Sequence, residues 1–191
     1  RKIEYEVVLH FLHRYLPSSG RILDFGGGPG RYAIYLAQQG YKVVLLDLSP
    51  ASIQLAQKKI SGKGLQDQFE LVRAGDQHSL SAFSSHYFDA VLCMGPLYHL
   101  PKKPEREFCL RECTRLLKPK HPFFFTAYPR LSYLMDTIRS GTFTHQTTQK
   151  SIQKVLNEGT ANPGEMPDTY FCTLREIQSW FEIGRLRQIE L

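Results

Sequence analysis

The sequence predicts an α/β fold: a doubly wound, mostly parallel sheet with a helical cap inserted after the fifth strand. Short apolar segments typical of buried strands alternate with segments of helical periodicity, which is the pattern of βαβ units. The 191 residues, 42% of them hydrophobic, are enough for one sizeable core. Residues 128–168 break the alternation and are too numerous for a plain connection. We therefore expect a single domain over 1–191, with its core at about 1–127 and 169–191 and its cap at about 128–168.

The expected core elements follow one another in the order that a parallel sheet requires. Buried strands are expected at Arg21–Phe25, Tyr41–Asp47, Gln68–Arg73, Phe88–Cys93 and His121–Ala127. Helices are expected at Val7–Tyr15, Arg31–Gln39, Pro50–Ile60 and Glu105–Leu117. The third of these helices has Ser49 as its expected N-cap and Pro50 at its first position. Right-handed crossovers between such strands give a doubly wound sheet.

The segment after the fifth strand has helical periodicity of its own. Two cap helices are expected, at Leu131–Arg139 and Thr147–Asn157, with loops rich in Gly, Pro, Asn and Thr around them. The core pattern then resumes with a helix at Leu174–Phe181 and a final strand at Leu186–Leu191. Such a segment is either a lid or a peripheral packing element, and we expect it to cover the active site.

A glycine-rich turn follows the first strand and opens a helix; its glycines are Gly26, Gly27, Gly28 and Gly30. Glycine lets the backbone turn sharply and approach a ligand closely, and a helix N-terminus offers unpaired N–H donors. Asp24 precedes the turn, where its carboxylate suits a ligand with an ammonium group and would repel a pyrophosphate. The spacing also differs from the dinucleotide pattern G-x-G-x-x-G, because Arg31 stands in place of its last glycine. An NAD-dependent oxidoreductase is therefore the weaker alternative.

A second carboxylate, Asp47, ends the second strand. A carboxylate at this place in a nucleotide-binding sheet accepts hydrogen bonds from ribose hydroxyls. The turn and the two carboxylates together favour a bound cofactor; the alternative is a tight turn that carboxylates only flank.

These residues resemble the motifs of the class I S-adenosylmethionine-dependent methyltransferases, a Rossmann-like family. The family's first motif, acidic-x-Gly-x-Gly-x-Gly, is matched from Asp24 to Gly30, and its acidic residue after the second strand is matched by Asp47. The resemblance spans about Arg21 to Thr126, and the family's seventh strand has no counterpart here. Further matches are Ala74-Gly75-Asp76-Gln77, Phe88–Gly95 and Leu116-Leu117-Lys118-Pro119, although Lys120 and His121 replace two glycines of the last motif.

The resemblance implies binding of S-adenosylmethionine and transfer of its methyl group to an O, N or C nucleophile, with S-adenosylhomocysteine as product. The implied cofactor-binding residues are Asp24, Gly26, Gly27, Gly28, Gly30, Asp47, Leu48, Asp76, Gln77, Met94 and Gly95. Asp76 has an alternative role as the N-cap of a helix near Ser79–Phe83, and Asp89 is expected to be structural. The segment Gly95–Leu100 resembles bacterial small-molecule or uncharacterised methyltransferases with a helical insertion after the fifth strand, so we expect a small-molecule acceptor.

Tyr98 and His99 come just after the fourth strand. Ligands of doubly wound sheets bind outside the carboxyl ends of the strands, and histidine is the usual general base at neutral pH. His99 is therefore the candidate catalytic base; its alternatives are to orient the substrate or to satisfy a backbone carbonyl. Tyr128 and Arg130, at the start of the cap, are candidate acceptor contacts or anchors of the cap.

The four cysteines form no C-x-x-C pair. Cys109 and Cys113 share one helix face, which leaves a thiol site of the kind found in arsenite methyltransferases as an alternative, but we expect packing against the sheet and no metal. No apolar run approaches the roughly 20 residues of a membrane span. We expect a soluble cytoplasmic enzyme with free thiols.

The net charge of +6 is spread along the chain without a block of like charge, so a solvated basic surface is expected. Two further alternatives keep the cofactor: an RNA methyltransferase, which uses the positive charge, and a non-catalytic regulator that binds S-adenosylmethionine. We expect a small-molecule acceptor rather than nucleic acid or a membrane as partner, and a monomer or homodimer.

Overall fold

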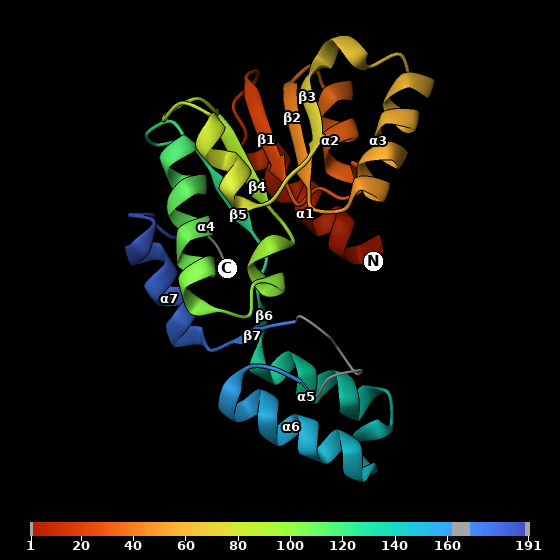
Figure 1. Cartoon of the computed structure of the whole chain (residues 1–191), viewed down its shortest axis with the longest axis vertical. Helices are drawn as coiled ribbons and strands as arrows, with labels where there is room; N and C mark the ends of the chain where they lie inside the picture. The colour runs from red at the N-terminus through yellow and green to blue at the C-terminus, as the bar shows by residue number, and fades with distance from the viewer. Residues whose placement is uncertain (1, 162–168, 190–191) are drawn as a thin grey trace. The chain divides into compact units, whose positions relative to one another are not determined.

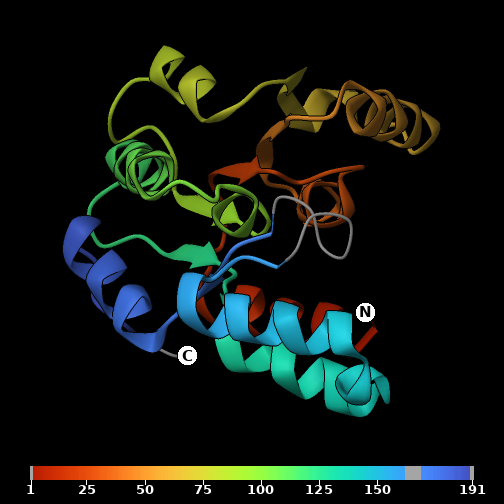
Figure 2. The same cartoon turned by 60° about the horizontal axis from the view of Figure 1, so that its bottom comes forward.

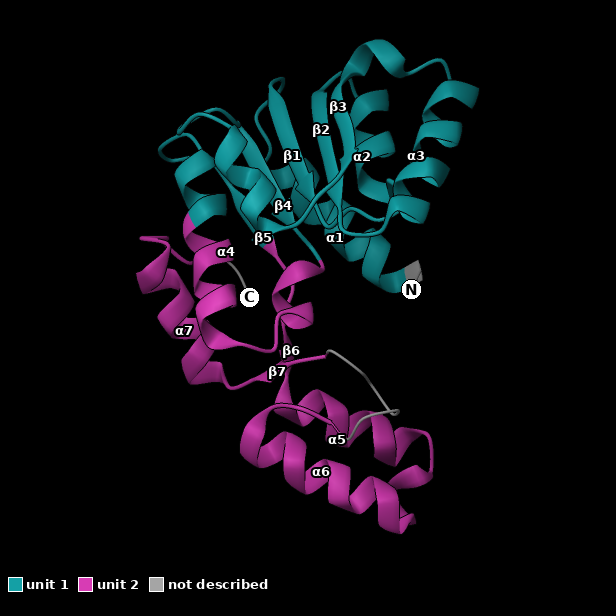
Figure 3. Cartoon of the chain, in the orientation of Figure 1, with its two compact units in different colours: residues 1–94, 112–124 teal, residues 95–111, 125–191 magenta. Residues whose placement is uncertain are grey.

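The computed structural model describes residues 2–161 and 169–189, which divide into two compact units (Figure 3). Unit 1 comprises residues 1–94 and 112–124, and unit 2 comprises residues 95–111 and 125–191. The expected division of one domain into a core and a cap at 128–168 remains a prediction, and residues 162–168 of that cap lie outside the described residues.

A parallel sheet forms the centre of unit 1, with the strand order β3-β2-β1-β4-β5 (Figure 1). Its strands are β1 (Arg21–Phe25), β2 (Lys42–Asp47), β3 (Phe69–Ala74), β4 (Ala90–Cys93) and β5 (Phe123–Phe125). In the central strand β1, Ile22 lies opposite Val43 of β2 on one side and Ala90 of β4 on the other. The chain therefore winds outward from β1 to β3 and then crosses to β4, which confirms the doubly wound parallel sheet.

Helices cover the sheet because apolar residues recur on one side of each helix. The helices before β4 are α1 (Lys2–Tyr15), α2 (Arg31–Gln38) and α3 (Pro50–Gly62), with short 3-10 turns η1 (Gln66–Gln68) and η2 (Gln77–Ala82). Ser49 caps α3 as predicted, since its side chain accepts from the Ser52 N–H at 3.2 Å. One core joins Leu12 of α1 and side chains of α2 and α3 to Ile22 and Leu45 of the sheet.

Unit 2 contains the cap helices and the segments that join them to the sheet. Its elements are η3 (Pro96–His99), the first part of α4 (Lys103–Leu116), β6 (Tyr128–Pro129), α5 (Arg130–Arg139), η4 (Thr142–Thr144), α6 (Gln146–Glu158), β7 (Phe171–Cys172) and α7 (Leu174–Ile183). Helices α5 and α6 lie side by side (Figure 2) and share a small core that includes Tyr133, Val155 and Phe171. The two predicted cap helices are therefore present.

Three predicted strands differ from the structure. The strand expected at Phe88–Cys93 begins only at Ala90 as β4, and Phe88 forms an isolated bridge with Leu117. The expected strand at His121–Ala127 is shortened to β5, because the chain leaves the sheet after Phe125 and pairs next as β6 with β7. The expected final strand at Leu186–Leu191 is wrong for residues 186–189, which form no strand; residues 190–191 lie outside the described residues. The Leu186 N–H instead donates to the Phe181 carbonyl at 2.7 Å and closes the end of α7.

Within the described ranges, no helix is long and apolar enough to cross a membrane.

Candidate functional site

The glycine-rich turn joins β1 to α2 in unit 1. Gly26, Gly28 and Gly30 have φ angles of 74°, 55° and 77°, a left-handed conformation that residues with a Cβ rarely adopt. Gly27 is required for a different reason: a Cβ there would lie 2.4 Å from Asp24 Oδ2 and 2.5 Å from Leu45 Cδ1. The sequence thus places glycine wherever the turn needs a positive φ or a close approach.

Asp24 lies beneath this turn and is completely buried. Its Oδ2 accepts a hydrogen bond from the Ala33 N–H of α2 at 3.1 Å, but its buried Oδ1 has no hydrogen-bond partner. Burial, and then the like charge of Asp47, raise the pKa of Asp24 to about 7, against the lowering effect of the Ala33 bond. A buried carboxylate oxygen without a donor is costly, so the site has the chemistry to receive a cationic donor such as an ammonium group.

Asp47 ends β2 and faces the same turn. Its Oδ2 accepts from the Gly28 N–H at 2.7 Å and its Oδ1 accepts from the Ser49 N–H at 2.9 Å. Each carboxylate oxygen keeps a further lone pair for a hydroxyl group. The next predicted residue, Leu48, is 76% exposed, so its side chain is available to the face of a ligand.

Asp76 follows β3 and caps η2, as its alternative role anticipated. Its Oδ1 accepts from the N–H groups of His78 at 3.0 Å and Ser79 at 3.2 Å. Burial acts to raise the pKa of Asp76, but these hydrogen bonds outweigh it and the pKa is lowered. Gln77 is the first residue of the capped turn. An adenine contact by Asp76 or Gln77 remains a prediction.

Asp89 is structural, as expected. Its side chain accepts from the Arg21 N–H at 2.9 Å and pairs with Lys118 Nζ at 2.7 Å. Burial acts to raise the pKa of Asp89, and these partners lower it below the usual value. The carboxylate therefore joins the first residue of β1 to the segment before β5.

The remaining predicted cofactor residues, Met94 and Gly95, directly follow β4. Met94 is half-buried and packs against the unit 1 core. Gly95 belongs to unit 2 and precedes η3 with φ −149° and ψ −50°. Their contact with a cofactor remains a prediction.

Three of the predicted acceptor residues come together in unit 2. The rings of Tyr98 and Tyr128 stack with their centroids 4.4 Å apart, and the His99 ring lies 4.6 Å from that of Tyr98. Tyr128 also stacks on Phe171 of β7 at 6.2 Å. A backbone hydrogen bond helps to hold these stacked rings in place, since the Tyr170 N–H donates to the Tyr98 carbonyl at 2.7 Å. His99 is exposed, while Tyr98 is half-buried.

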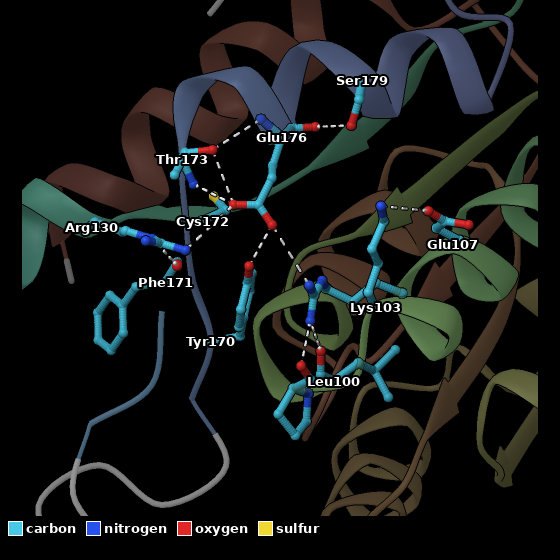
Figure 4. Close-up of polar contacts among 12 residues, drawn as sticks. Leu100, Lys103, Glu107, Arg130, Tyr170, Phe171, Cys172, Thr173, Glu176 and Ser179 are labelled. Carbon is cyan, nitrogen blue, oxygen red and sulfur yellow. Dashed lines mark hydrogen bonds and ion pairs between the residues drawn. The ribbon is translucent and has the colours of Figure 1, made fainter. Parts of the chain in front are cut away.

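Arg130, the fourth predicted acceptor residue, is engaged within the chain (Figure 4). Its Nη1 donates to the carbonyls of Leu156 at 2.6 Å and Asn157 at 2.9 Å. Its Nη2 lies 3.9 Å from Glu176 Oε2, which Figure 4 labels beside it. These contacts tie the start of α5 to the end of α6 and to α7. They favour the anchoring alternative for Arg130.

Sequence reasoning missed Arg106 and Glu176, which belong to the same network; Figure 4 labels Glu176 at its centre. Arg106 is 3% exposed; its Nη1 donates to the Leu100 and Pro101 carbonyls, both at 2.7 Å, and its Nη2 lies 3.8 Å from Glu176 Oε1. The Tyr170 ring covers the guanidinium at 3.5 Å, and the Tyr170 hydroxyl donates to Glu176. The network thus holds the segment that follows Tyr98 and His99.

One part of this network was readable in the sequence. Thr173 and Glu176 form a capping box at the start of α7: the Thr173 hydroxyl accepts from the Glu176 N–H at 3.1 Å, and Glu176 Oε2 accepts from the Thr173 N–H at 2.8 Å. The spacing Thr-x-x-Glu before an apolar helix is the signal of this motif. Its further pairing with two arginines depends on tertiary structure and leaves no local signal.

The cysteines agree with the packing interpretation in their burial, because Cys93, Cys109 and Cys113 are completely buried. The Sγ atoms of Cys93 and Cys113 lie within 4.8 Å of each other, and Cys109 precedes Cys113 by one turn of α4. Structural zinc takes four ligands, and a buried thiol packs as a small apolar group. Packing without a metal therefore remains our prediction.

A family model described as a methyltransferase domain matches residues 22–120, which include the glycine turn, Asp47, Asp76 and Tyr98. Two similar relatives are ubiquinone biosynthesis O-methyltransferases. That of Chromobacterium violaceum is 33% identical over 133 residues, covering 68% of this chain and 55% of the relative. That of Xanthomonas axonopodis pv. citri is 32% identical over 114 residues, covering 60% and 45%. The chain thus spans about half the length of the curated relatives it matches.

A solved structure supports the same fold. The S-adenosylmethionine-dependent methyltransferase of Methanosarcina mazei superposes with a TM-score of 0.71 at 24% identity, covering 92% of this chain and 83% of that one. An identity this low is evidence for the fold alone. Because the family model covers more than half of the sequence and includes the glycine turn, this chain belongs to the family of methyltransferase domains.

Proposed function

We propose that this chain binds S-adenosylmethionine in unit 1 and transfers its methyl group to an O, N or C nucleophile of a small-molecule acceptor. The observation that carries the proposal is the buried Oδ1 of Asp24, which lies beneath a glycine turn and has no hydrogen-bond partner. The ammonium group of the cofactor's methionine part supplies the positive charge and the donors that this oxygen needs. The names of the ubiquinone biosynthesis relatives support a small acceptor.

The other residues of unit 1 receive roles that follow from their places. The N–H groups of the four glycines are bonded within the chain, so the turn contributes its shape, and the start of α2 borders the methionine part. Asp47 accepts from the ribose hydroxyls, and Asp76 with Gln77 borders the adenine. Asp47 already bonds to the Gly28 N–H, so the ribose and methionine subsites share one hydrogen-bonded unit. Leu48, Met94 and Gly95 supply apolar surface and backbone room.

The cofactor's sulfonium carries the reactive methyl group and is itself a good leaving group. The chain's task is therefore to hold the acceptor in line with that methyl group and to exclude water, and such positioning supplies several kcal/mol of rate enhancement. Tyr98 and Tyr128 are the proposed acceptor contacts. His99 is the proposed base where the nucleophile is a hydroxyl group, because it is exposed and adjoins Tyr98.

Calorimetric titration with S-adenosylhomocysteine, run beside NADH, tests this function. We expect S-adenosylhomocysteine to bind with a micromolar dissociation constant and NADH to give no heat of binding. A screen of small acceptors with radiolabelled S-adenosylmethionine then identifies the substrate class. Binding of NADH alone, or of neither ligand, would overturn the proposal.

The cellular location and the oligomeric state of the protein are also predictions. We expect the protein in the cytoplasm as a monomer or homodimer. Light scattering of the purified chain checks the assembly, and fractionation of expressing cells checks the location.

A further inference from the structure

Three backbone carbonyls beside the candidate acceptor residues are held by groups from other parts of unit 2. The turn η3 contains Tyr98, and the chain has no regular secondary structure between this turn and α4. The Tyr98 carbonyl accepts from the Tyr170 N–H at 2.7 Å. The carbonyls of Leu100 and Pro101 both accept from Arg106 Nη1 at 2.7 Å. The path of the chain at the end of η3 therefore depends on these two donors.

Arg106 is suited to hold two carbonyls at once. Its side chain is almost completely buried, and its guanidinium lies 3.5 Å from the centroid of the Tyr170 ring. Burial lowers the pKa of Arg106, and the charges of Tyr170 and Glu176 act against this effect. A guanidinium stays charged in proteins and presents its donors in a rigid planar fork, whereas a lysine ammonium is one flexible donor group. The two donors of the segment, Arg106 and Tyr170, thus also contact each other.

Glu176 joins this arginine to the other half of the proposed acceptor site. Its Oε1 lies 3.8 Å from Arg106 Nη2, and its Oε2 lies 3.9 Å from Arg130 Nη2. Figure 4 shows Arg130 and Glu176 facing each other. Arg130 directly follows β6, the strand that contains Tyr128. One carboxylate thus connects the segments that carry Tyr98 and Tyr128, whose rings stack with their centroids 4.4 Å apart.

We propose that Arg106 is a positioning residue for methyl transfer, which holds Tyr98 and His99 in place through two backbone carbonyls. The inference rests on the proposed function, because it takes Tyr98 and His99 as acceptor residues. Displacement of a positioned group by about 1 Å can slow a reaction about a hundredfold. Release of the two carbonyls should therefore slow the chemical step, and it should leave cofactor binding in unit 1 unchanged.

The test measures methyl transfer per cofactor-binding site, which separates a loss of activity from a loss of folded protein. The stoichiometry of S-adenosylhomocysteine binding in calorimetry counts the sites. The acceptor probe is whichever of catechol, histamine and phloroglucinol the wild-type chain methylates fastest with radiolabelled S-adenosylmethionine. These three compounds offer an oxygen, a nitrogen and a carbon nucleophile. We expect Arg106→Lys to lower kcat per site about thirtyfold, to change the acceptor KM less, and to leave the dissociation constant of S-adenosylhomocysteine unchanged.

Two changes at Tyr170 repeat the test without removing the buried arginine. Tyr170→Leu removes the ring that covers the guanidinium, so kcat per site should fall about fivefold. Tyr170→Phe keeps that ring and the backbone N–H, so it should retain the wild-type kcat. The matched control is Arg111→Lys: Arg111 is exposed on the same helix and pairs with Glu107 at 2.7 Å, and its replacement should leave kcat unchanged.

Wild-type kcat per site in Arg106→Lys would overturn the inference and would show that the network only stabilises the fold. If Arg106→Lys yields no folded protein, the Tyr170 pair decides: equal kcat per site in Tyr170→Leu and Tyr170→Phe overturns the inference. If the wild-type chain binds no S-adenosylhomocysteine, or methylates none of the three probes, the proposed function falls and the inference falls with it. The two failures are distinguishable, because only the second appears in the wild-type chain.

Discussion

Among the residues that the structure describes, each unit buries one charged side chain, Asp24 in unit 1 and Arg106 in unit 2, and their surroundings are opposite. In unit 2, the Arg106 guanidinium donates hydrogen bonds to two backbone carbonyls. It also contacts the Tyr170 ring and the charge of Glu176, although its Nε has no hydrogen-bond partner. In unit 1, the Asp24 carboxylate accepts one hydrogen bond, from the Ala33 N–H, and the neighbouring charge that acts on it is the negative charge of Asp47. The chain compensates the buried cation and leaves the buried anion incomplete.

This difference separates a structural charge from a binding charge. A buried charge that the chain compensates fixes the elements around it, because its removal leaves the partners unpaired. A buried charge that the chain does not compensate lowers stability until a ligand completes it. The comparison therefore predicts that changes at Glu176 alter mainly folding, whereas changes around Asp24 alter mainly ligand binding.

The largest expected effect is that of Glu176→Ala. This change leaves Arg106 buried without its counter-charge and removes the capping box of α7, so we expect the free energy of unfolding to fall by about 3 kcal/mol. Urea denaturation measures the loss. Glu107→Ala is the matched control: Glu107 pairs with the exposed Lys103 and Arg111, and its loss should cost less than about 0.5 kcal/mol. Equal effects of both changes would contradict the structural role of the network.

Gly27→Ala should instead weaken ligand binding around Asp24. The added Cβ would overlap with Asp24 and Leu45, which are both buried, so the carboxylate must move. We expect S-adenosylhomocysteine affinity to fall about a hundredfold, equivalent to roughly 2.7 kcal/mol. Calorimetry measures the change. Gly62→Ala is the control, because nothing lies within 4 Å of its added Cβ; wild-type affinity in both variants would refute the tight approach.

Ligand binding at Asp24 should also depend on pH. Because the pKa of unliganded Asp24 is about 7 and an ammonium ligand needs the ionised form, the S-adenosylhomocysteine dissociation constant should rise by roughly tenfold for each pH unit below 7. The charged or titratable neighbours that act on this carboxyl are Asp47 and Tyr32. Calorimetry from pH 5.5 to 7.5 checks the slope, and Asp24→Asn should remove it.

The unliganded protein should show the opposite trend. A carboxyl whose pKa is raised in the folded state contributes stability that is full below pH 4 and is lost as the pH rises through 7. Relative to Asp24→Asn, the wild-type free energy of unfolding should therefore decrease between pH 5.5 and 7.5. A thermal-melt series with and without ligand measures both trends, and parallel trends would show that Asp24 does not bind the cation.

The smallest expected effect is that of Asp47→Ala. Loss of a charged acceptor for the ribose hydroxyls should weaken S-adenosylhomocysteine binding by about 1 kcal/mol or roughly fivefold. Asp67→Ala, at an exposed carboxylate of the same unit, is the control. Unchanged affinity of Asp47→Ala in calorimetry would remove the ribose assignment.

Local patterns predicted unit 1 well because its signals are local. Short apolar runs predicted the strands and the period of 3.6 residues predicted the helices. Asp24 and Asp47 lie near the ends of two strands that a parallel sheet brings to one edge, where Asp47 meets Gly28 of the turn. Even the cap at Ser49 and the structural role of Asp89 followed from position alone. In unit 1, sequence neighbours in the motif are also spatial neighbours.

Unit 2 was predicted less completely because its contacts join distant segments. Strands β6 and β7 are two residues each and too short to leave a pattern, yet they bring Tyr128 beside Phe171. Arg106 and Glu176 belong to helices with charged residues at many positions, so their sequence context resembles a solvated helix face. The failed final strand has the same cause: an apolar pattern at residues 186–189 gives no information on whether a partner strand is present.

The pairing of β1 also has a consequence for the order of folding. Ile22 meets Val43 after a single helical crossover, but it meets Ala90 only after two further crossovers have been closed. Closing a longer loop costs more chain entropy, and distant pairings slow a folding reaction. We therefore expect β1, β2 and β3 to assemble first, as a half-sheet with one exposed edge on β1. The arrival of β4 at that edge is then the rate-limiting event, and it is the step most exposed to misfolding and aggregation.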